Sequence, residues 1–189
     1  MKVYKDDETF EKIDFSQKPL AIGTYENCTF NDCNFFEANL SNSTFADCVF
    51  VNCNISMAKI DQTTLNEVSF RNCKLLGLHF DTCNKFLFTV NFDNCQLNLS
   101  SFYRLKLKKT SFKNCQLHET DFTETDLSQS VFDNCDLAKA IFENTILEKV
   151  DFRTAYNYSI DPELNRIKKA KFSITGIIGL LHKYDIEIM

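Results

Sequence analysis

The sequence predicts an all-β fold in which the chain winds as a four-sided parallel β-helix. Two observations carry this prediction: a large apolar side chain recurs at every fifth residue, and a repeat of twenty residues is superimposed on the shorter one. A period of five fits neither an α-helix, at about 3.6 residues per turn, nor a flat strand, at about 2.0. A backbone that turns one corner per repeat satisfies it, because every fifth side chain then points toward a common axis.

The five-residue repeat runs in two registers, separated by a slip of two residues between Phe80 and Leu87. The predicted inward centres of the first register are Phe30, Phe35, Leu40, Phe45, Phe50, Ile55, Ile60, Leu65, Phe70, Leu75 and Phe80. Those of the second are Leu87, Phe92, Leu97, Phe102, Leu107, Phe112, Leu117, Phe122, Leu127, Phe132, Leu137, Phe142, Leu147 and Phe152. The slip is expected to expose Phe86 and Phe88, either as a contact point for a partner or as a bulge that adjusts the coil.

A second inward position lies two residues before each centre and holds small residues, such as Ala38, Ser43 and Thr63. All nine cysteines of the chain occupy this position. We therefore interpret them as buried packing residues and not as ligands. Zinc sites need cysteine pairs two to four residues apart, whereas Cys28 and Cys33 are separated by a whole side of the coil. Stacked side chains that point in parallel seldom reach the torsion that a disulfide requires.

The twenty-residue repeat defines one coil of four sides. Related phrases such as Phe50-Val51-Asn52-Cys53 and Phe70-Arg71-Asn72-Cys73 return once per coil. Equivalent sides should stack at about 4.8 Å. Sides rich in Phe alternate with sides rich in Leu, which would fill a square core without voids.

The β-helix is predicted over residues 1–155, with an N-terminal cap over about residues 1–24 and the register slip at 81–87. Residues 156–189 should form a short helical cap and dimerisation segment. Asp161-Pro162-Glu163 has the residue types of a helix start, and a second start is expected at Ser173. Residues 185–189 alternate as a short strand does.

The C-terminal segment carries apolar residues at helical spacing, followed by two in the alternating stretch. This apolar face either covers the open end of the coil or pairs with a second copy in a homodimer; we favour the homodimer. The candidate dimer interface comprises Ile174, Ile177, Ile178, Leu181, Tyr184, Ile186 and Ile188.

Composition and motifs argue against an enzyme and against a cofactor. The chain has 189 residues, a net charge of -5, no Trp and four Gly. His79, His118 and His182 have no spaced nucleophile, and neither a phosphate-binding loop nor a zinc-protease motif is present. We expect no catalytic residue, no metal, no small-molecule substrate and no membrane span. Without a signal-peptide pattern at the N-terminus, a cytoplasmic location is predicted.

Any function should therefore lie on the outer surface, where charge is unevenly distributed. Between residues 119 and 151, nine acidic residues at outward positions face two lysines. This band is the candidate partner-binding surface: Glu119, Asp121, Glu124, Asp126, Asp133, Asp136, Glu143, Glu148 and Asp151. It is either an ordinary solvated face or a row of charges for a cationic groove. The preceding coil holds a basic stripe of Arg104, Lys106, Lys108, Lys109 and Lys113, which is too short to predict direct nucleic-acid binding.

The repeat resembles the pentapeptide-repeat family over roughly residues 10–155, as units such as Ala38-Asn39-Leu40 and Thr125-Asp126-Leu127 illustrate. The segment Ile160-Asp161-Pro162-Glu163-Leu164 is similar to the tail of the microcin-immunity (McbG-type) members, which are related to the quinolone-resistance (Qnr-type) members. The resemblance implies a right-handed quadrilateral β-helix. It also implies a dimeric, acidic DNA mimic that binds DNA gyrase or topoisomerase IV and protects it from toxins or quinolones.

Two hypotheses remain open at this point. The first is the topoisomerase-protecting DNA mimic, and the second is a general interaction scaffold with an unknown protein partner. Pentapeptide repeats serve proteins with many roles, and fold alone does not fix function.

Overall fold

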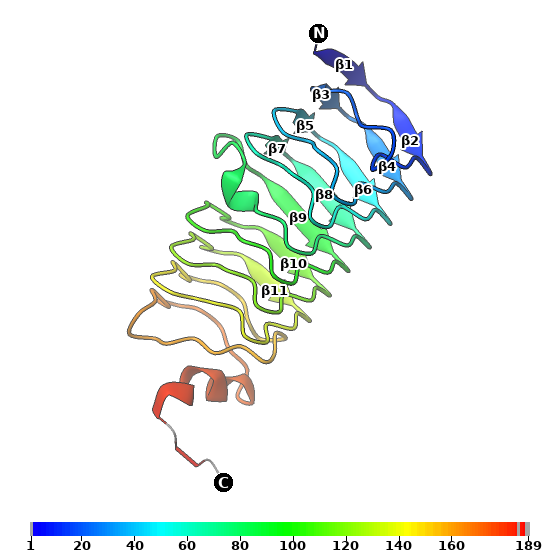
Figure 1. Cartoon of the computed structure of the whole chain (residues 1–189). Coiled ribbons are helices and arrows are strands. Elements are labelled where there is room, and N and C mark those ends of the chain that lie inside the picture. Colours follow the sequence, from blue (N-terminus) through cyan, green and yellow to red (C-terminus); the bar gives the residue numbers. More distant parts are fainter. Residues whose placement is uncertain (1, 185, 188–189) are drawn as a thin grey trace.

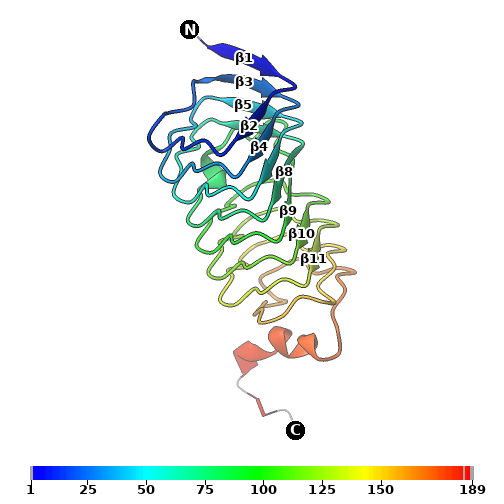
Figure 2. The same ribbon diagram turned by 90° about the vertical axis from the view of Figure 1, so that its right-hand side faces the viewer.

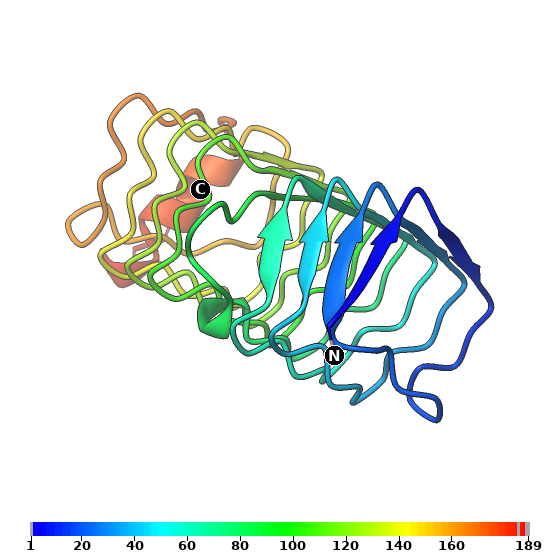
Figure 3. The ribbon, with the colours of Figure 1, turned by 90° about the horizontal axis from the view of Figure 1, so that it is seen from above.

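The computed structural model describes residues 2–184 and 186–187, and its coils stack into one elongated parallel β-helix with the two termini at opposite ends (Figure 1). The stack is seen from a second side in Figure 2 and from above in Figure 3. Paired residues lie twenty apart, as Phe50 and Phe70 do. Across the slip, Phe70 pairs with Phe92, so the coil that contains the slip is longer by two residues. The predicted all-β, four-sided fold is confirmed.

Two sides of the coil carry regular strands. The four-stranded sheet has the order β1-β3-β5-β7 and consists of β1 (Val3–Asp6), β3 (Gly23–Glu26), β5 (Thr44–Ala46) and β7 (Thr64–Asn66). The seven-stranded sheet has the order β11-β10-β9-β8-β6-β4-β2 and consists of β2 (Thr9–Glu11), β4 (Thr29–Asn31), β6 (Val49–Val51), β8 (Val68–Arg71), β9 (Val90–Asp93), β10 (Ser111–Lys113) and β11 (Val131–Asp133). The other two sides are joined by single parallel bridges, such as Gln96–Gln116 and Ser101–Asp121.

We number the four sides in chain order from the seven-stranded sheet. Face 1 has the inward residues Phe10, Phe30, Phe50, Phe70, Phe92, Phe112, Phe132 and Phe152. Face 2 has Phe15, Phe35, Ile55, Leu75, Leu97, Leu117 and Leu137, and face 3 has Leu20, Leu40, Ile60, Phe80, Phe102, Phe122 and Phe142. Face 4, which begins with the four-stranded sheet, has Tyr25, Phe45, Leu65, Leu107, Leu127 and Leu147. Corner 4–1 is the corner between faces 4 and 1, and the other corners are named in the same way.

Aromatic rings from two faces fill the centre of the coil. Phe112 is stacked on Phe132 along face 1, with ring centroids 4.8 Å apart. Its edge meets Phe122 of face 3 at 6.0 Å and nearly a right angle. Offset stacks and edge-to-face pairs are the favoured arrangements of aromatic rings. The alternation of Phe-rich and Leu-rich sides, expected from the sequence, holds for the later coils.

The small inward position has a polar role as well as a packing role. All nine cysteines are free and buried there. At most positions that hold a hydroxyl, the hydroxyl donates to a carbonyl of the preceding coil, as Thr125 does to Phe102 at 2.8 Å. Cysteine thiols point to the same kind of carbonyl, as Cys73 does to Phe50 at 3.4 Å. Donors are therefore common at this position but not required, since buried Val68 and Leu105 also occupy it.

The register slip differs from its prediction in two residues. Leu87 was expected on the core side, but its side chain is 56% exposed and its backbone is left-handed, with φ 58°. Phe88 was expected outside, but it is partly buried and its ring meets Phe80 at 6.3 Å. Phe86 is 75% exposed, as predicted. The slip also contains the short 3-10 helix η1 (Phe80–Thr82), so the extra residues bulge outward and Phe88 takes the inward place.

The coil has further rungs in the predicted N-terminal cap and continues past its predicted C-terminal boundary. Residues 1–24, expected as a cap, include β1 and β2, which pair with β3 and β4 as further rungs. At the other end the ladder continues past residue 155, because Arg166 bridges Ile146 and Lys171 bridges Asp151.

The C-terminal segment is less helical than predicted. The helix expected at Asp161 is wrong: its carboxylate accepts the N–H of Glu163 at 2.8 Å in a turn. The end of the rod is covered instead by two 3-10 helices, η2 (Gly176–Leu180) and η3 (His182–Tyr184). Asp185, Ile188 and Met189, part of the predicted strand, lie outside the described residues. None of the helices in residues 2–184 and 186–187 is long and apolar enough to cross a membrane.

Candidate interaction surfaces

The nine acidic residues of the candidate surface do not share one face of the rod. Their positions in the coil place them on all four sides and on two corners. Asp133 and Asp151 lie on face 1, Asp136 on face 2, Asp121 and Glu143 on face 3, Asp126 and Glu148 on face 4, Glu119 at corner 2–3 and Glu124 at corner 3–4. The band that looks continuous in sequence is therefore wound around the rod.

Four of the acidic residues hold the turns that make the corners. Asp121, Asp126, Asp136 and Asp151 each stand one residue before an inward centre. In each case the carboxylate accepts the backbone N–H two residues later, at 2.8–3.2 Å. Asx side chains stabilise turns in this way. These carboxylates therefore have a structural role, and a partner that binds them would contact groups that already accept a hydrogen bond from a turn.

Ion pairs neutralise part of the band. Glu124 is held by Arg104, 2.6 Å away, which lowers the pKa of that carboxylate. Asp126 lies 3.2 Å from Lys108. Burial acts to raise the pKa of Asp126, but hydrogen bonds from Ser128 outweigh burial and the pKa is lowered. Exposed ion pairs contribute little stability, but each reduces the charge that a partner meets.

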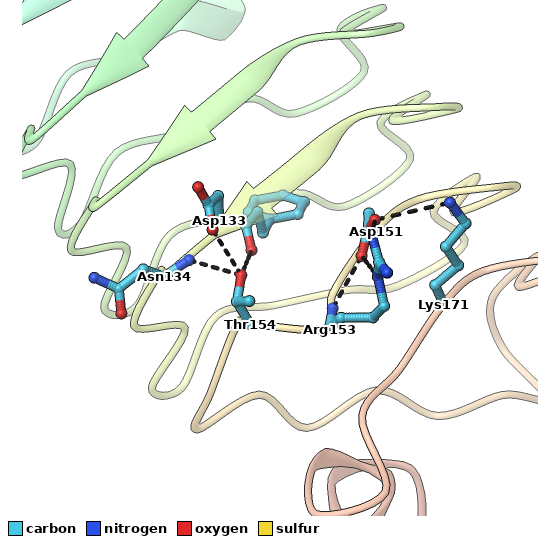
Figure 4. Close-up of polar contacts among 7 residues, drawn as sticks. Asp133, Asn134, Asp151, Arg153, Thr154 and Lys171 are labelled. Atoms are coloured by element: carbon cyan, nitrogen blue, oxygen red, sulfur yellow. Dashed lines mark hydrogen bonds and ion pairs between the residues drawn. The ribbon is translucent and has the colours of Figure 1, made fainter.

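The same applies to Glu119 and Asp151, and to Asp136 only when His118 is protonated. Glu119 lies 3.5 Å from Lys139, and the Oδ2 atom of Asp136 lies 2.9 Å from Nε2 of His118. The guanidinium of Arg153 approaches Asp151 to 2.7 Å and lowers its pKa, and Lys171 lies 3.8 Å away (Figure 4).

Four acids of the band take part in no ion pair within the described residues: Asp121, Asp133, Glu143 and Glu148. Asp133 accepts a hydrogen bond from the Thr154 hydroxyl at 2.9 Å (Figure 4). Glu143 is exposed on face 3, two residues after Ile141, which bridges Asp121. Face 3 thus carries unpaired acids of the band from two successive coils.

A basic surface occupies face 4 of the same coils, which adjoins face 3. In the last four coils, face 4 and its two flanking corners carry eight basic side chains and only three acidic ones, those of Glu124, Asp126 and Glu148. The basic residues are Arg104, Lys106, Lys108, Lys109, Lys149, Arg166, Lys168 and Lys169. The predicted stripe is therefore extended by residues forty to sixty positions later. The spacing of whole coils was the signal in the sequence that could have revealed them.

The C-terminal residues of the candidate dimer interface are exposed at the end of the rod. Ile174 is 93% exposed and Ile178 is 44% exposed, whereas Leu181 is only partly exposed. Ile177, Tyr184 and Ile186 are exposed as well, and Ile188 lies outside the described residues. The segment is fixed to the last coil by close packing: Gly179 lies so near Tyr158 that a Cβ there would overlap its carbonyl oxygen and ring.

A cavity of about 360 Å³ opens beside this contact. It is lined by residues of the last coil and of the C-terminal segment, among them Tyr156, Ser173 and His182. Ser173 and Thr175 hydroxyls are hydrogen-bonded to each other at 3.2 Å. Across residues 2–184 and 186–187, no group of three His, Cys, Asp or Glu side chains is placed to hold a metal ion.

Comparison with known proteins places the fold. No curated protein matches the chain. A trypsin-treated variant of QnrB1, a plasmid-mediated fluoroquinolone resistance protein, is similar with a TM-score of 0.72 and 16% identity, over 99% of this chain and 92% of that chain. A second trypsin-treated variant of QnrB1 is similar with a TM-score of 0.59 and 16% identity, over 100% of this chain and 99% of that chain. A third similar structure is HetL, a pentapeptide repeat protein involved in heterocyst differentiation regulation from the cyanobacterium Nostoc. Its TM-score is 0.39 at 13% identity, over 89% of this chain and 86% of that chain.

These likenesses concern the fold, since the identities are low. The family model of the pentapeptide repeat region, in contrast, recognises the sequence itself, and it matches residues 24–86 and 85–156. The matched residues cover more than half of the chain and include every complete coil from β3 to Phe152. The chain belongs to the pentapeptide-repeat family.

Proposed function

We propose that this protein is a non-enzymatic interaction protein that occupies the DNA-binding groove of DNA gyrase or topoisomerase IV and protects the enzyme from toxins or quinolones. The observation that carries the proposal is the likeness in fold to QnrB1, a fluoroquinolone resistance protein, over 99% of this chain. The role requires a cytoplasmic location, since bacterial topoisomerases act there.

The acidic side of the rod supplies the physical basis for binding. Duplex DNA presents one negative charge per about 1.7 Å of its axis, and proteins that bind it offer a cationic groove. A rigid rod with carboxylates repeated at coil spacing can enter such a groove. The candidates are Asp121 and Glu143 on face 3, with Glu119 at the adjoining corner and Asp136 on face 2. Face 4 of the same coils is basic, so the proposed mimicry uses faces 2 and 3.

The test is a gyrase supercoiling assay with a quinolone, with and without the protein. Protection should appear as recovered supercoiling at micromolar protein. The variant with Glu119→Lys and Glu143→Lys should lose protection at least tenfold, because it reverses two exposed charges that cap no turn. If the wild-type protein changes neither the supercoiling nor the inhibition of gyrase and topoisomerase IV, the proposal is wrong.

Glu37→Lys is the matched control. Glu37 occupies the same corner 2–3 as Glu119, and both are exposed with φ near 55°. It lies four coils nearer the N-terminus, outside the acidic band. Equal loss of protection in this control would show that net charge matters and that the acidic band does not.

The C-terminal segment is proposed as a homodimer contact that joins two rods end to end. Exposed isoleucines at the end of a soluble rod support this contact, because burying them against a second copy removes apolar surface from water. Ile178→Glu should convert the dimer to a monomer in sedimentation velocity and leave the circular dichroism of the rod unchanged. If the mass does not change, the segment only covers the last coil and is not a dimer contact.

A second candidate function is a scaffold for an unknown protein partner. It is favoured by apolar side chains exposed along corner 2–3 and the adjoining edge of face 2, namely Phe36, Met57 and Leu99. A partner held there should be lost with Met57→Ser and Leu99→Ser, and should be insensitive to Glu119→Lys and Glu143→Lys. The opposite pattern would support the topoisomerase proposal.

A further inference from the structure

One corner of the rod changes its charge from acidic to basic at the register slip. The nine equivalent residues of corner 4–1, in order along the rod, are Asp7, Asn27, Asp47, Glu67, Thr89, Lys109, Gln129, Lys149 and Lys169. Thr89 belongs to the coil of the slip, and four residues lie on each side of it. Before Thr89 each residue is an acid or an amide, and after it each is a lysine or an amide.

The backbone holds these residues in one row along the rod. Apart from Thr89, all of them have left-handed backbone, with φ between 52° and 65°. Away from the slip the corner is joined to the next coil, as when the N–H of Asp47 donates to Asn66 and that of Lys109 donates to Ser128; the N–H of Thr89 donates instead to Leu65 in the coil before it. Successive residues are therefore spaced by the rise of one coil, about 4.8 Å.

The charges of this row are available to a partner. Asp47, Glu67, Lys109 and Lys149 are exposed, and none of the nine is in an ion pair within the described part of the chain. The adjoining row on face 4 reinforces the two ends, with Asp6 beside Asp7 and Lys168 beside Lys169. Elsewhere in the rod, by contrast, Glu119 and Lys139 of corner 2–3 neutralise each other.

An apolar projection marks the middle of the same side. Phe86 and Leu87 of the slip are exposed on face 4, separated from Thr89 only by the inward Phe88. Aromatic residues such as Phe are enriched in interfaces, whose core is depleted of charge and whose rim is polar.

We infer that corner 4–1 and face 4 form a side-by-side contact with a second, antiparallel copy of this chain. A two-fold axis through Thr89 brings each residue of one row opposite its mirror position in the other. Glu67 then faces Lys109 of the second copy, Asp7 faces Lys169, and the amides of Asn27 and Gln129 face Lys149 and Asp47. Phe86 and Leu87 of the two copies meet at the axis.

The symmetry explains why the reversal is at the slip. An isologous contact repeats every pair twice, so the sequence of charges along one edge must be antisymmetric about the axis. Corner 4–1 meets this condition at its outermost and innermost positions. Glu26 and Glu148 on face 4 would face each other, which is unfavourable and makes the contact weak and dependent on salt.

This contact is separate from the end-to-end contact of the C-terminal segment and does not depend on binding to a topoisomerase. It covers face 4 and leaves Asp121 and Glu143 on face 3 free. If the protein does not protect gyrase in the supercoiling assay, the side-by-side dimer is unaffected. If the side-by-side dimer is absent, the proposed protection of gyrase is equally unaffected.

Sedimentation equilibrium of the full chain with Ile178→Glu tests the inference, because that background removes the end-to-end contact. Dimers should form at about 20 mM salt and dissociate at about 500 mM, where the screening length falls to a few ångströms. Lys109→Glu should weaken the dimer at least tenfold, and so should Glu67→Lys. A dimer that persists at high salt, or no dimer at low salt, overturns the inference.

Charge exchange makes the test specific to the antiparallel register. The chain that carries both Glu67→Lys and Lys109→Glu should dimerise as well as the parent, because each new lysine faces a new glutamate. Equimolar single variants should also form a mixed dimer, whereas each alone should not. Lys139→Glu is the matched control, since Lys139 is exposed with similar φ at corner 2–3. If the exchange fails to restore association, or Lys139→Glu weakens it equally, the inference is wrong.

Discussion

The thiol of Cys53 points to the carbonyl oxygen of Phe30, 3.3 Å away and one coil earlier. The same relation joins Cys135 to Phe112 at 3.3 Å and Thr145 to Phe122 at 2.8 Å. In each pair the donor is twenty-three residues after the acceptor. The small inward position therefore ties each coil to the carbonyl groups of the one before it.

The cysteines should be unreactive in the folded protein. All nine are buried, and burial raises the pKa of Cys48 to about 12. Because the thiolate is the nucleophile, we expect fewer than one thiol per chain to react with a disulfide reagent at pH 8. All nine should react in denaturant. Rapid labelling of several thiols in native protein would contradict the burial of this position.

Removing the donor of the small position should destabilise the fold. Thr125→Val keeps the shape but removes the 2.8 Å hydrogen bond to the carbonyl of Phe102. The cost should be about 0.5–1.5 kcal/mol, because that carbonyl still accepts the N–H of Leu105. Thr125→Cys should cost less than the valine variant, because the chain uses cysteine in the same role. Chemical denaturation measures both, with Thr123→Val, at a partly exposed position, as the control. Equal stability of the valine variant and the parent would show that the hydrogen bond has no net effect.

Truncating one ring of the aromatic core should create a cavity. Phe112 is fully buried between Phe92 and Phe132, and Phe112→Ala should cost about 3–5 kcal/mol. Phe86→Ala, at the exposed slip, should change stability by less than about 0.5 kcal/mol. The free energy of unfolding from urea titration provides the comparison. If both variants lose similar free energy of unfolding, the assignment of Phe112 to the core and of Phe86 to the surface is wrong.

Acid should weaken the last coils through Asp151. Arg153 lowers the pKa of Asp151 below its usual 3.8, so this carboxylate stabilises the folded state above that pH. The contribution is lost as pH falls through the lowered value, because the folded protein then takes up a proton. Asp151→Asn should lower Tm by a few degrees at pH 6, since exposed pairs contribute little, and by less at pH 2. Scanning calorimetry at both values tests the sign. If Asp151→Asn lowers Tm more at pH 2 than at pH 6, the ionised carboxylate of Asp151 does not stabilise the fold.

The periodic part of the fold was predictable because every coil repeats the same packing problem. The centres from Phe30 to Phe80 and from Phe92 to Phe152 are buried as predicted. Leu87 and Phe88 were exchanged because the period alone cannot tell where two extra residues bulge. The helix start at Asp161 was wrong because the same Asx chemistry also makes the corner turns, and the ladder continues beyond it.

The candidate surfaces were less predictable, for a geometric reason. Acidic residues that adjoin in sequence, such as Asp133 and Asp136, lie on different faces because each five residues turn one corner. Basic residues that adjoin on the surface, such as Lys149 and Lys169, are a whole coil apart in sequence. A surface on a coil of this kind is found by aligning the chain at twenty-residue intervals, with an allowance of two at the slip.

The left-handed corners determine how such a rod can be shortened or lengthened. A corner residue such as Asn52 has φ 55°, and its N–H donates to Arg71 in the next coil. That conformation is costly for residues other than glycine, and the neighbouring coil compensates for it. Deleting one residue would set every later corner against the wrong neighbour, whereas deleting twenty would leave each with an equivalent one. Evolution can therefore change the reach of this molecule in steps of a whole turn of the coil, while the width of its core stays constant.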